Sequence, residues 1–228
     1  MNNKNFVAII LARGGSKEIK HKNLILINNK PLIYWVIKDC LKSKLIDSVW
    51  VSSDNKKILK FSEKNGAKII ERPKKYAKDN STSESAWIHA VKFIEKKNIY
   101  IKNIVGLQPT SPLKNNNDLD SACKLFLKKK FDSLLSTQKI KDYFVWNKRN
   151  NRLYANYNIF KRSRRQAIDE KYLENGSIYI FNKEKFLKKK NRLFGKIGIY
   201  VMSKINSFQI DTLEDVKLMN KIARGKKI

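Results

Sequence analysis

Three basic side chains stand close together near the start of the chain, around a pair of glycines. Arg13, Lys17 and Lys22 flank Gly14 and Gly15, directly after an apolar run. A glycine-rich loop after a strand can turn successive backbone N–H groups toward a phosphate, and the cations add charge. The loop has neither the ending of a Walker motif nor the spacing of a dinucleotide fingerprint. It predicts a site for an anionic ligand, against the alternative of an ordinary loop in a lysine-rich chain.

A second group of side chains offers hydrogen bonds without charge. Gln108, Thr110 and Ser111 lie in the run LQPTSPLK, after a predicted strand, and the two prolines of this run fix a turn. Ligands of open parallel sheets bind at the carboxyl ends of strands. The run therefore predicts a binding loop for a polar ligand.

Arginines and a late aspartate suggest further binding groups. Arg164 and Arg165 are suited to bidentate binding of a carboxylate, although a solvated basic cluster or an RNA-facing patch is the alternative. Asp211 precedes a predicted closing helix, and as an isolated residue it is compatible with a helix cap. Arg72 and Ser83 flank a turn that ends at a predicted helix cap, and taken alone they carry little weight.

The elements that must position these residues alternate between strand and helix patterns. Strands are predicted at 6–11, 47–52, 68–71, 104–107 and 133–137, and helices at 31–41, 56–64, 83–97 and 118–130. Such a series of βα units predicts the Rossmann-like α/β class, with a mostly parallel sheet and helices on both faces.

The alternation breaks between residues 140 and 173, in an aromatic and basic stretch without a clear period. We interpret residues 140–173 as an insertion into a single domain that spans residues 1–228. Two further strands, at 177–181 and 197–202, and a closing helix at 212–223 follow the insertion.

Composition limits the class of protein. The chain has 228 residues, of which 42% are hydrophobic and 31% charged, which is typical of one globular domain with a sizeable core. No apolar run has the length of a membrane span, and no signal-peptide pattern precedes Arg13, so we expect a cytoplasmic protein. The two cysteines, Cys40 and Cys123, fall in helical patterns and are expected to be buried and unpaired.

The formal net charge of +30 is compatible with nucleic acid, a membrane surface or an anionic small substrate. Lysines occur along the whole chain, which favours a compositional bias for most of them. Nucleic-acid binding is an alternative function, because aromatic residues are interleaved with the basic ones. These aromatic residues are Tyr143, Phe144, Trp146, Tyr154 and Tyr157.

Five polar runs in chain order resemble the CMP-sugar-acid synthetases, a family of acylneuraminate cytidylyltransferases and their legionaminate, pseudaminate and KDO relatives. The runs are LARGGSKEIKHKN, Arg72-Pro73 with Asp79 and Ser83, LQPTSPLK, RRQAIDEKYLENGSIYIF, and Gln209-Ile210-Asp211-Thr212. LQPTSPLK is the most specific, because it matches the family's run in order with one conservative change, Lys114. Glu18 and Lys20 depart from the usual glycine and proline, and Gln209 departs from the usual aspartate.

The resemblance implies a nucleotide-diphospho-sugar transferase fold with two substrate sites. For CTP it implies contacts from Leu11, Ala12, Arg13, Gly14, Gly15, Asn23, Arg72 and Ser83, with the phosphates held by Arg13, Lys17 and Lys22. For the sugar acid it implies contacts from Gln108, Thr110, Ser111, Arg165 and Asn175, with Arg165 on the carboxylate. Mg²⁺ is implied at Asp211, with the amide oxygen of Gln209 as a second donor.

The implied reaction is attack by the anomeric hydroxyl of a nine-carbon 2-keto sugar acid, of the N-acetylneuraminate or legionaminate type, on the α-phosphate of CTP. Pyrophosphate leaves, and the implied catalytic residues are Arg13, Lys17 and Lys22, which neutralise its charge, together with Asp211, which holds the metal ion against the phosphates. Family members commonly dimerise through the inserted region, so a homodimer is expected. The departures at Glu18 and Gln209 leave open a member that binds nucleotide with weakened catalysis.

Overall fold

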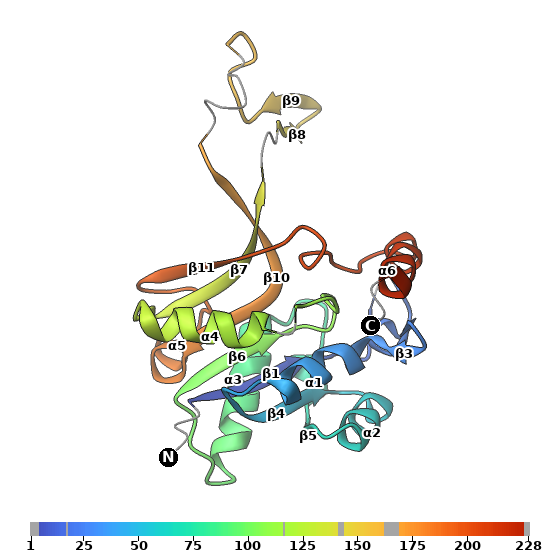
Figure 1. Cartoon of the computed structure of the whole chain (residues 1–228), viewed down its shortest axis with the longest axis vertical. Helices are drawn as coiled ribbons and strands as arrows, with labels where there is room; N and C mark the ends of the chain where they lie inside the picture. Colours follow the sequence, from blue (N-terminus) through green and yellow to red (C-terminus); the bar gives the residue numbers. More distant parts are fainter. Residues whose placement is uncertain (1–4, 17, 116, 141–143, 162–168, 226–228) are drawn as a thin grey trace.

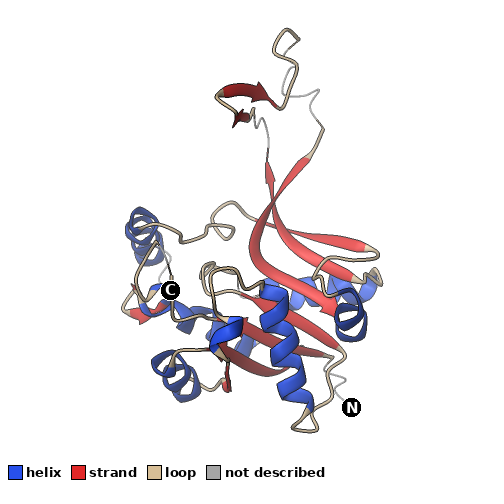
Figure 2. Ribbon diagram, turned by 180° about the vertical axis from the view of Figure 1, so that it is seen from behind, coloured by secondary structure: helices blue, strands red, loops and turns tan. Residues whose placement is uncertain are grey.

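A seven-stranded sheet forms the centre of the protein, with strand order β11-β7-β10-β6-β1-β4-β5 (Figures 1 and 2). The computed structural model describes residues 5–16, 18–115, 117–140, 144–161 and 169–225. The strands of the sheet are β1 (Phe6–Leu11), β4 (Ile46–Ser53), β5 (Lys68–Glu71), β6 (Asn103–Leu107), β7 (Ser133–Ile140), β10 (Lys171–Asn182) and β11 (Ile197–Met202).

Most neighbouring strands are parallel, as the alternating sequence pattern predicts. β1 pairs in parallel with both β4 and β6, β4 pairs with β5, and β11 pairs with β7. β10 is the exception, because it runs antiparallel between β6 and β7. The chain moves from β1 outward to β4 and β5 and then returns to β6 on the other side of β1. The order therefore reverses beside β1, where ligands of open α/β sheets usually bind.

Helices cover both faces of the sheet, which confirms the predicted α/β class. Alternate residues of β1 enter opposite cores, since successive side chains of a strand point to opposite faces: Ala8 and Ile10 lie in one core, and Val7 and Ile9 in the other. The first core is closed by α1 (Leu32–Lys42), α2 (Lys56–Lys64) and α4 (Asp118–Lys128). The second core is closed by α3 (Ser83–Glu95) and α5 (Lys183–Lys189).

A third, smaller core connects the end of the chain to the loop after β1. It contains Ile19, Ile27, Ile210 and Met219, all of them buried. The elements around this core are the 3-10 helix η1 (Lys22–Leu24), the hairpin strands β2 (Leu26–Ile27) and β3 (Lys30–Pro31), and α6 (Leu213–Gly225). This packing brings the segment before α6 close to the glycine loop, although the two are far apart in sequence.

Helix starts are fixed by side chains that accept backbone hydrogen bonds. Asn55 caps α2 by accepting from the N–H groups of Lys57 and Ile58 at 2.9 and 3.2 Å. Thr82 caps α3 through its hydroxyl, which accepts from the N–H of Ser85 at 3.2 Å. Such caps contribute about 1 kcal/mol each and fix where the first turn begins.

The first core contains both cysteines, Cys40 on α1 and Cys123 on α4, as buried free thiols. Burial raises the pKa of each thiol well above its usual value. This confirms the prediction that they are unpaired core residues.

Among the described residues, no helix is long and apolar enough to cross a membrane.

A long arm projects from the sheet where β7 and β10 extend beyond their neighbours (Figure 1). Part of the segment predicted as irregular is strand: β10 begins at Lys171 instead of residue 177, and the short strands β8 (Trp146–Arg149) and β9 (Arg152–Ala155) pair as a hairpin. The sequence pattern was misleading here because both faces of the arm carry exposed residues, so no buried face imposes a period.

Candidate active site

The glycine loop after β1 is held in place by its neighbours. The N–H of Gly14 donates to Asp54 Oδ1 at 2.8 Å, and the side-chain amide of Asn23 donates to the carbonyl of Arg13 at 2.8 Å. The glycine loop can lie this close to Asp54 and Asn55 because residue 14 is a glycine. A Cβ on Gly14 would lie 2.8 Å from the Cβ of Asn55. Gly15 is open to solvent, so its backbone can be approached by a ligand. Lys17 lies outside the described residues.

Two adjoining pockets open at the carboxyl ends of β1 and β6, where the strand order reverses. Both pockets are lined by Leu11, Arg13 and Gln108. The larger, of about 270 Å³, is completed by Arg72, Tyr76, Ala77, Lys78, Asp79, Ser81, Thr82 and Ser83. The smaller, of about 150 Å³, is completed by Gly15, Ser16, Lys22, Asn23, Pro109 and Thr110.

Arg72 gives the larger pocket a rigid cationic wall. Its side chain is buried, and its guanidinium donates to the carbonyl of Ser52 at 2.7 Å and to that of Tyr76 at 3.5 Å. Burial lowers the pKa of Arg72 to about 10, so the group still carries its charge at neutral pH. Its Nε has no hydrogen-bond partner among the described residues. A fixed guanidinium of this kind can read the hydrogen-bonding edge of a ligand.

Arg13 and Lys22 of the glycine loop lie in ion pairs with acids from distant elements. Arg13 Nη1 is 2.7 Å from Asp79 Oδ1, and Lys22 Nζ is 2.7 Å from Asp211 Oδ1. The side chains of Asp79 and Asp211 are 57% and 61% exposed. Each ion pair therefore contributes little to the stability of the fold. Both cations can therefore change partner when an anionic ligand enters.

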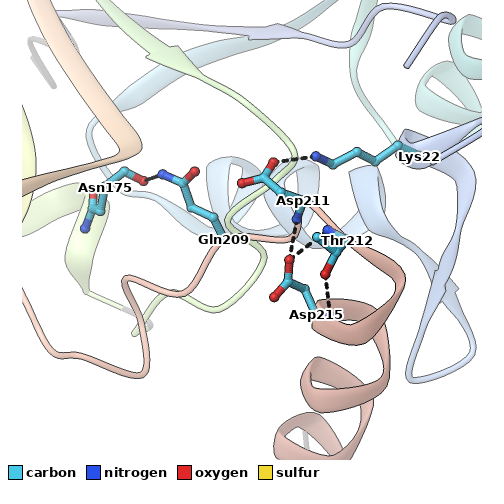
Figure 3. Close-up of polar contacts among 6 residues, drawn as sticks. All are labelled: Lys22, Asn175, Gln209, Asp211, Thr212 and Asp215. Atoms are coloured by element: carbon cyan, nitrogen blue, oxygen red, sulfur yellow. Dashed lines mark hydrogen bonds and ion pairs between the residues drawn. The ribbon is translucent and has the colours of Figure 1, made fainter. Parts of the chain in front are cut away.

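Figure 3 shows how the segment before α6 presents Asp211 to Lys22. The backbone N–H groups of Asp211 and Thr212 both donate to Asp215 Oδ2, at 2.9 and 2.7 Å, and the N–H of Asp215 donates to the Thr212 hydroxyl at 3.2 Å. Partial burial raises the pKa of Asp215, but these backbone hydrogen bonds outweigh it and lower the pKa below its usual value. The capping box fixes the backbone and leaves the Asp211 carboxylate facing Lys22.

Gln209 and Asn175 are engaged with each other. The Gln209 amide donates to the carbonyl of Asn175 and points toward β10, whereas Asp211 points toward Lys22 (Figure 3). The buried Asn175 side chain accepts from the Ser136 hydroxyl at 2.6 Å and donates to the Ser207 hydroxyl at 2.9 Å. Both residues also line a separate pocket of about 330 Å³ at the base of the arm. Direct sugar contact by Asn175 and metal contact by Gln209 stay predictions.

The donor set around Asp211 fits a metal ion shared with a ligand. No group of three or more His, Cys, Asp or Glu side chains that could hold a metal occurs among the described residues. Asp211 offers one accessible carboxylate at the edge of the phosphate-sized pocket that Lys22 lines. Mg²⁺ prefers carboxylate and phosphate oxygens and often keeps several waters. The residues thus suit Mg²⁺ held jointly by Asp211 and phosphates.

The LQPTSPLK loop joins the pockets to the Asp211 segment. Gln108 and Thr110 line the smaller pocket, and the carbonyl of Thr110 accepts from the N–H of Ile210 at 2.9 Å. Ser111 is fully buried, its carbonyl accepts from Lys114 Nζ at 2.6 Å, and neither residue lines the two pockets. The sugar role of Ser111 stays a prediction, and Arg165 lies outside the described residues.

Two residues of the site escaped the sequence patterns. Asp54 holds the glycine loop through Gly14, and Tyr76 lines the larger pocket beside Arg72. A signal for Asp54 existed, because a polar run ends β4, which is the neighbour of β1 at the reversal point. Tyr76 carried no signal, since it stands in a lysine-rich turn. Glu18, the unusual acid of the loop, is exposed.

Comparisons with known proteins agree with this geometry. The family model described as cytidylyltransferase matches residues 7–227. An N-acylneuraminate cytidylyltransferase from Oncorhynchus mykiss is 34% identical over 79% of this chain, and the match covers 42% of that protein. The chain thus spans less than half the length of that relative. A pseudaminic acid cytidylyltransferase from Campylobacter jejuni is 29% identical, with 92% of this chain and 93% of that protein covered.

Solved structures show the same fold at low sequence identity. A CMP:2-keto-3-deoxy-manno-octonic acid synthetase complexed with CTP superposes with a TM-score of 0.73 at 16% identity, over 97% of this chain and 99% of the other. A 4-diphosphocytidyl-2C-methyl-D-erythritol synthase from Anaerococcus prevotii gives 0.65 at 16% identity, with the same coverage. With three of the motifs lining one pair of pockets and the family model matching nearly the whole sequence, the chain belongs to the cytidylyltransferase family.

Proposed function

We propose that this protein transfers CMP from CTP to the anomeric hydroxyl of a nine-carbon 2-keto sugar acid and releases pyrophosphate. One observation carries the proposal: motifs from distant parts of the sequence line two adjoining pockets that share Arg13 and Gln108. The relatives support it, since they are an N-acylneuraminate cytidylyltransferase and a pseudaminic acid cytidylyltransferase.

In this proposal, the nucleoside occupies the larger pocket. Its volume of about 270 Å³ suits a pyrimidine nucleoside better than an extended ligand. Arg72 and Ser83 then provide hydrogen-bond donors for the base, and Ser81 and the N-cap residue Thr82 complete that side of the pocket. The pocket contains both aromatic and hydrogen-bonding groups, as ligand sites usually do.

The triphosphate extends into the smaller pocket, where the glycine loop and Lys22 lie. Arg13 stands in both pockets and can contact the α-phosphate and the leaving phosphates. The exposed backbone at Gly15 adds hydrogen-bond donors, and we assign Lys17 to the same phosphates from the sequence motif. These preorganised charges would stabilise the pyrophosphate as it leaves.

The sugar acid approaches from Gln108 and Thr110, and we assign Arg165 to its carboxylate from the sequence motif. A bond forms between the anomeric oxygen and the α-phosphorus while the bond from that phosphorus to the bridging oxygen breaks, and the hydroxyl proton passes to water. Mg²⁺, held by Asp211 and the phosphates, would supply further positive charge at the leaving oxygens. The protein's part is alignment and charge stabilisation.

We further propose a sugar acid of the N-acetylneuraminate or legionaminate type, because the run NGSIYI resembles the run of those enzymes more than that of the pseudaminate or KDO enzymes. The reaction would take place in the cytoplasm and supply an activated sugar for surface polysaccharides. The glycine loop and the LQPTSPLK loop suit two small ligands. They do not support nucleic-acid binding to the same degree.

The test is release of pyrophosphate by the purified protein with CTP, Mg²⁺ and one of four sugar acids: N-acetylneuraminate, legionaminate, pseudaminate or KDO. We expect release with one of the first two, and little release when UTP or ATP replaces CTP. If none of the sugar acids supports release while CTP still binds, the protein is a nucleotide-binding relative without this activity. Saturable, sequence-selective RNA binding at physiological salt would favour the nucleic-acid alternative.

A further inference from the structure

We infer that Lys22 and Asp211 form an exchangeable ion pair that makes the binding of CTP and of the metal ion depend on each other. The inference rests on the proposed function and deepens it. Without ligands, the two charges neutralise each other at 2.7 Å. When both ligands are present, the ammonium turns to phosphate and the carboxylate turns to metal.

The Asp211 side of the pair is anchored through its backbone. Hydrogen bonds from the N–H groups of Asp211 and Thr212 to Asp215 hold it from α6, and the Ile210 N–H is bound to the Thr110 carbonyl of the LQPTSPLK loop. Ile210 itself is fully buried. The backbone thus stays in place while the Asp211 carboxylate, 61% exposed, is the part that can change partner.

The Lys22 side is anchored through its stem. Lys22 is the first residue of η1, and its backbone N–H donates to the Ile19 carbonyl at 3.2 Å. Only 11% of the Lys22 side chain is exposed, so the ammonium is held in a narrow region at the edge of the phosphate-sized pocket. One ammonium therefore serves two anions, the Asp211 carboxylate and a phosphate of the ligand.

Competition follows from this arrangement. A metal ion that binds before CTP must displace Lys22 from Asp211, and CTP that binds before the metal must displace Asp211 from Lys22. Because binding linkage is reciprocal, each ligand removes the obstacle to the other by the same factor. A partly exposed ion pair of this kind corresponds to an effect of about two- to fivefold.

The metal arm of the test uses Mn²⁺ as the probe, followed by electron paramagnetic resonance without nucleotide. Lys22→Met should bind Mn²⁺ about two- to fivefold more tightly than the wild type, because the competing cation is gone. Lys20→Met removes an equal charge from an exposed position two residues away and serves as the control. The gain should vanish when Lys22→Met is combined with Asp211→Asn. If Lys22→Met binds Mn²⁺ no more tightly than Lys20→Met, the inference is wrong.

The nucleotide arm measures CTP binding by calorimetry in EDTA. Asp211→Asn should bind metal-free CTP about two- to fivefold more tightly than the wild type, since Lys22 is released for phosphate. Glu214→Gln, an equal charge change at an exposed position on the first turn of α6, is the control. The double variant Lys22→Met/Asp211→Asn should lose the gain. Equal CTP affinity of Asp211→Asn and Glu214→Gln would overturn the inference.

The two arms separate this inference from the proposed function. If CTP binds to none of the variants even with Mg²⁺, the proposed function fails, and the Mn²⁺ arm alone then decides whether Lys22 competes for Asp211. If CTP binds and is turned over while all affinities match their controls, the function stands and the exchangeable pair does not. Circular dichroism of each variant checks that the fold is retained.

Discussion

At the scale of single residues, the site prepares positive charge before any ligand arrives. Arg13 and Lys22 are held by carboxylates from two other segments, so neither cation points freely into solvent. Arg13 differs from Lys22 because it lines both pockets and can contact phosphates on either side of the bond that breaks. Its planar guanidinium can also bind two phosphate oxygens at once.

Replacement of Arg13 by alanine should reduce turnover by about 10²- to 10³-fold, a typical loss for one preorganised charge contact in a transition state. Pyrophosphate release at saturating CTP measures it. Arg224→Ala removes the same group from an exposed position on α6 and should leave turnover unchanged. An Arg13→Ala enzyme with wild-type turnover would remove Arg13 from the mechanism.

The sequence predicted those site residues whose neighbours form a distinctive run. Arg13, Lys22, Gln108 and Asp211 were found in this way, and the structure brings all four to one region. What it could not predict is which groups bind each other, because the Gln209–Asn175 contact depends on how the chain before α6 packs beside β10. Contacts between residues that are far apart in sequence produce no periodic pattern that sequence analysis could detect.

At the scale of elements, the packing of α3 on the sheet determines where the larger pocket lies. Trp87 of α3 is fully buried, and its indole N–H donates to the carbonyl of Ile9 in β1 at 3.3 Å. The ring lies directly on Gly106 of β6, where no Cβ keeps it away. This contact holds the first turn of α3, and with it Ser83, beside the pocket.

A Gly106→Ala substitution should therefore destabilise the protein by about 1–3 kcal/mol, as overpacking of a core does. The added Cβ would lie 2.7 Å from Trp87 Cζ2 and 3.3 Å from Phe181 Cε1. Urea unfolding followed by circular dichroism measures the free energy of unfolding. Gly15→Ala is the control, because nothing lies within 4 Å of its Cβ, and it should change stability by less than about 0.5 kcal/mol. Equal stability of both variants would contradict this account of α3.

Element boundaries were predictable where one face of the element is buried. β1, α2, β5 and β11 have the predicted limits, since buried apolar runs or clear end signals define them. β10 was predicted only from residue 177, because its first residues, Lys171 to Glu174, are exposed and belong to the arm. Burial supplies the pattern that sequence analysis detects, and an arm that projects from the sheet lacks it.

At the scale of the whole molecule, the arm exposes several large apolar side chains, and clusters of such side chains often mark association surfaces. Phe160 is 95% exposed, Leu153 64% and Trp146 50%. These residues lie within the segment that we interpret as the inserted dimerisation region. We therefore expect the protein to be a homodimer whose partners cover each other's arms.

Light scattering coupled to size-exclusion chromatography should give the mass of a dimer at micromolar concentration. The triple variant Trp146→Ser/Leu153→Ser/Phe160→Ser should shift the mass to that of a monomer, because it removes the apolar surface of the arm. Tyr100→Ser changes a residue that is 78% exposed outside the arm and should leave the dimer intact. A monomeric wild-type protein would show that the arm serves another purpose.

The rate at which a reagent labels the two buried thiols measures how often the core opens. Cys40 and Cys123 sit on different helices of the same core, and their raised pKa values leave almost no reactive thiolate in the folded state. A thiol reagent can reach them only when α1 or α4 separates from the sheet. The rate of labelling of the unaltered protein thus reports how often each helix detaches, and any ligand that slows both rates equally must stabilise the domain as a unit.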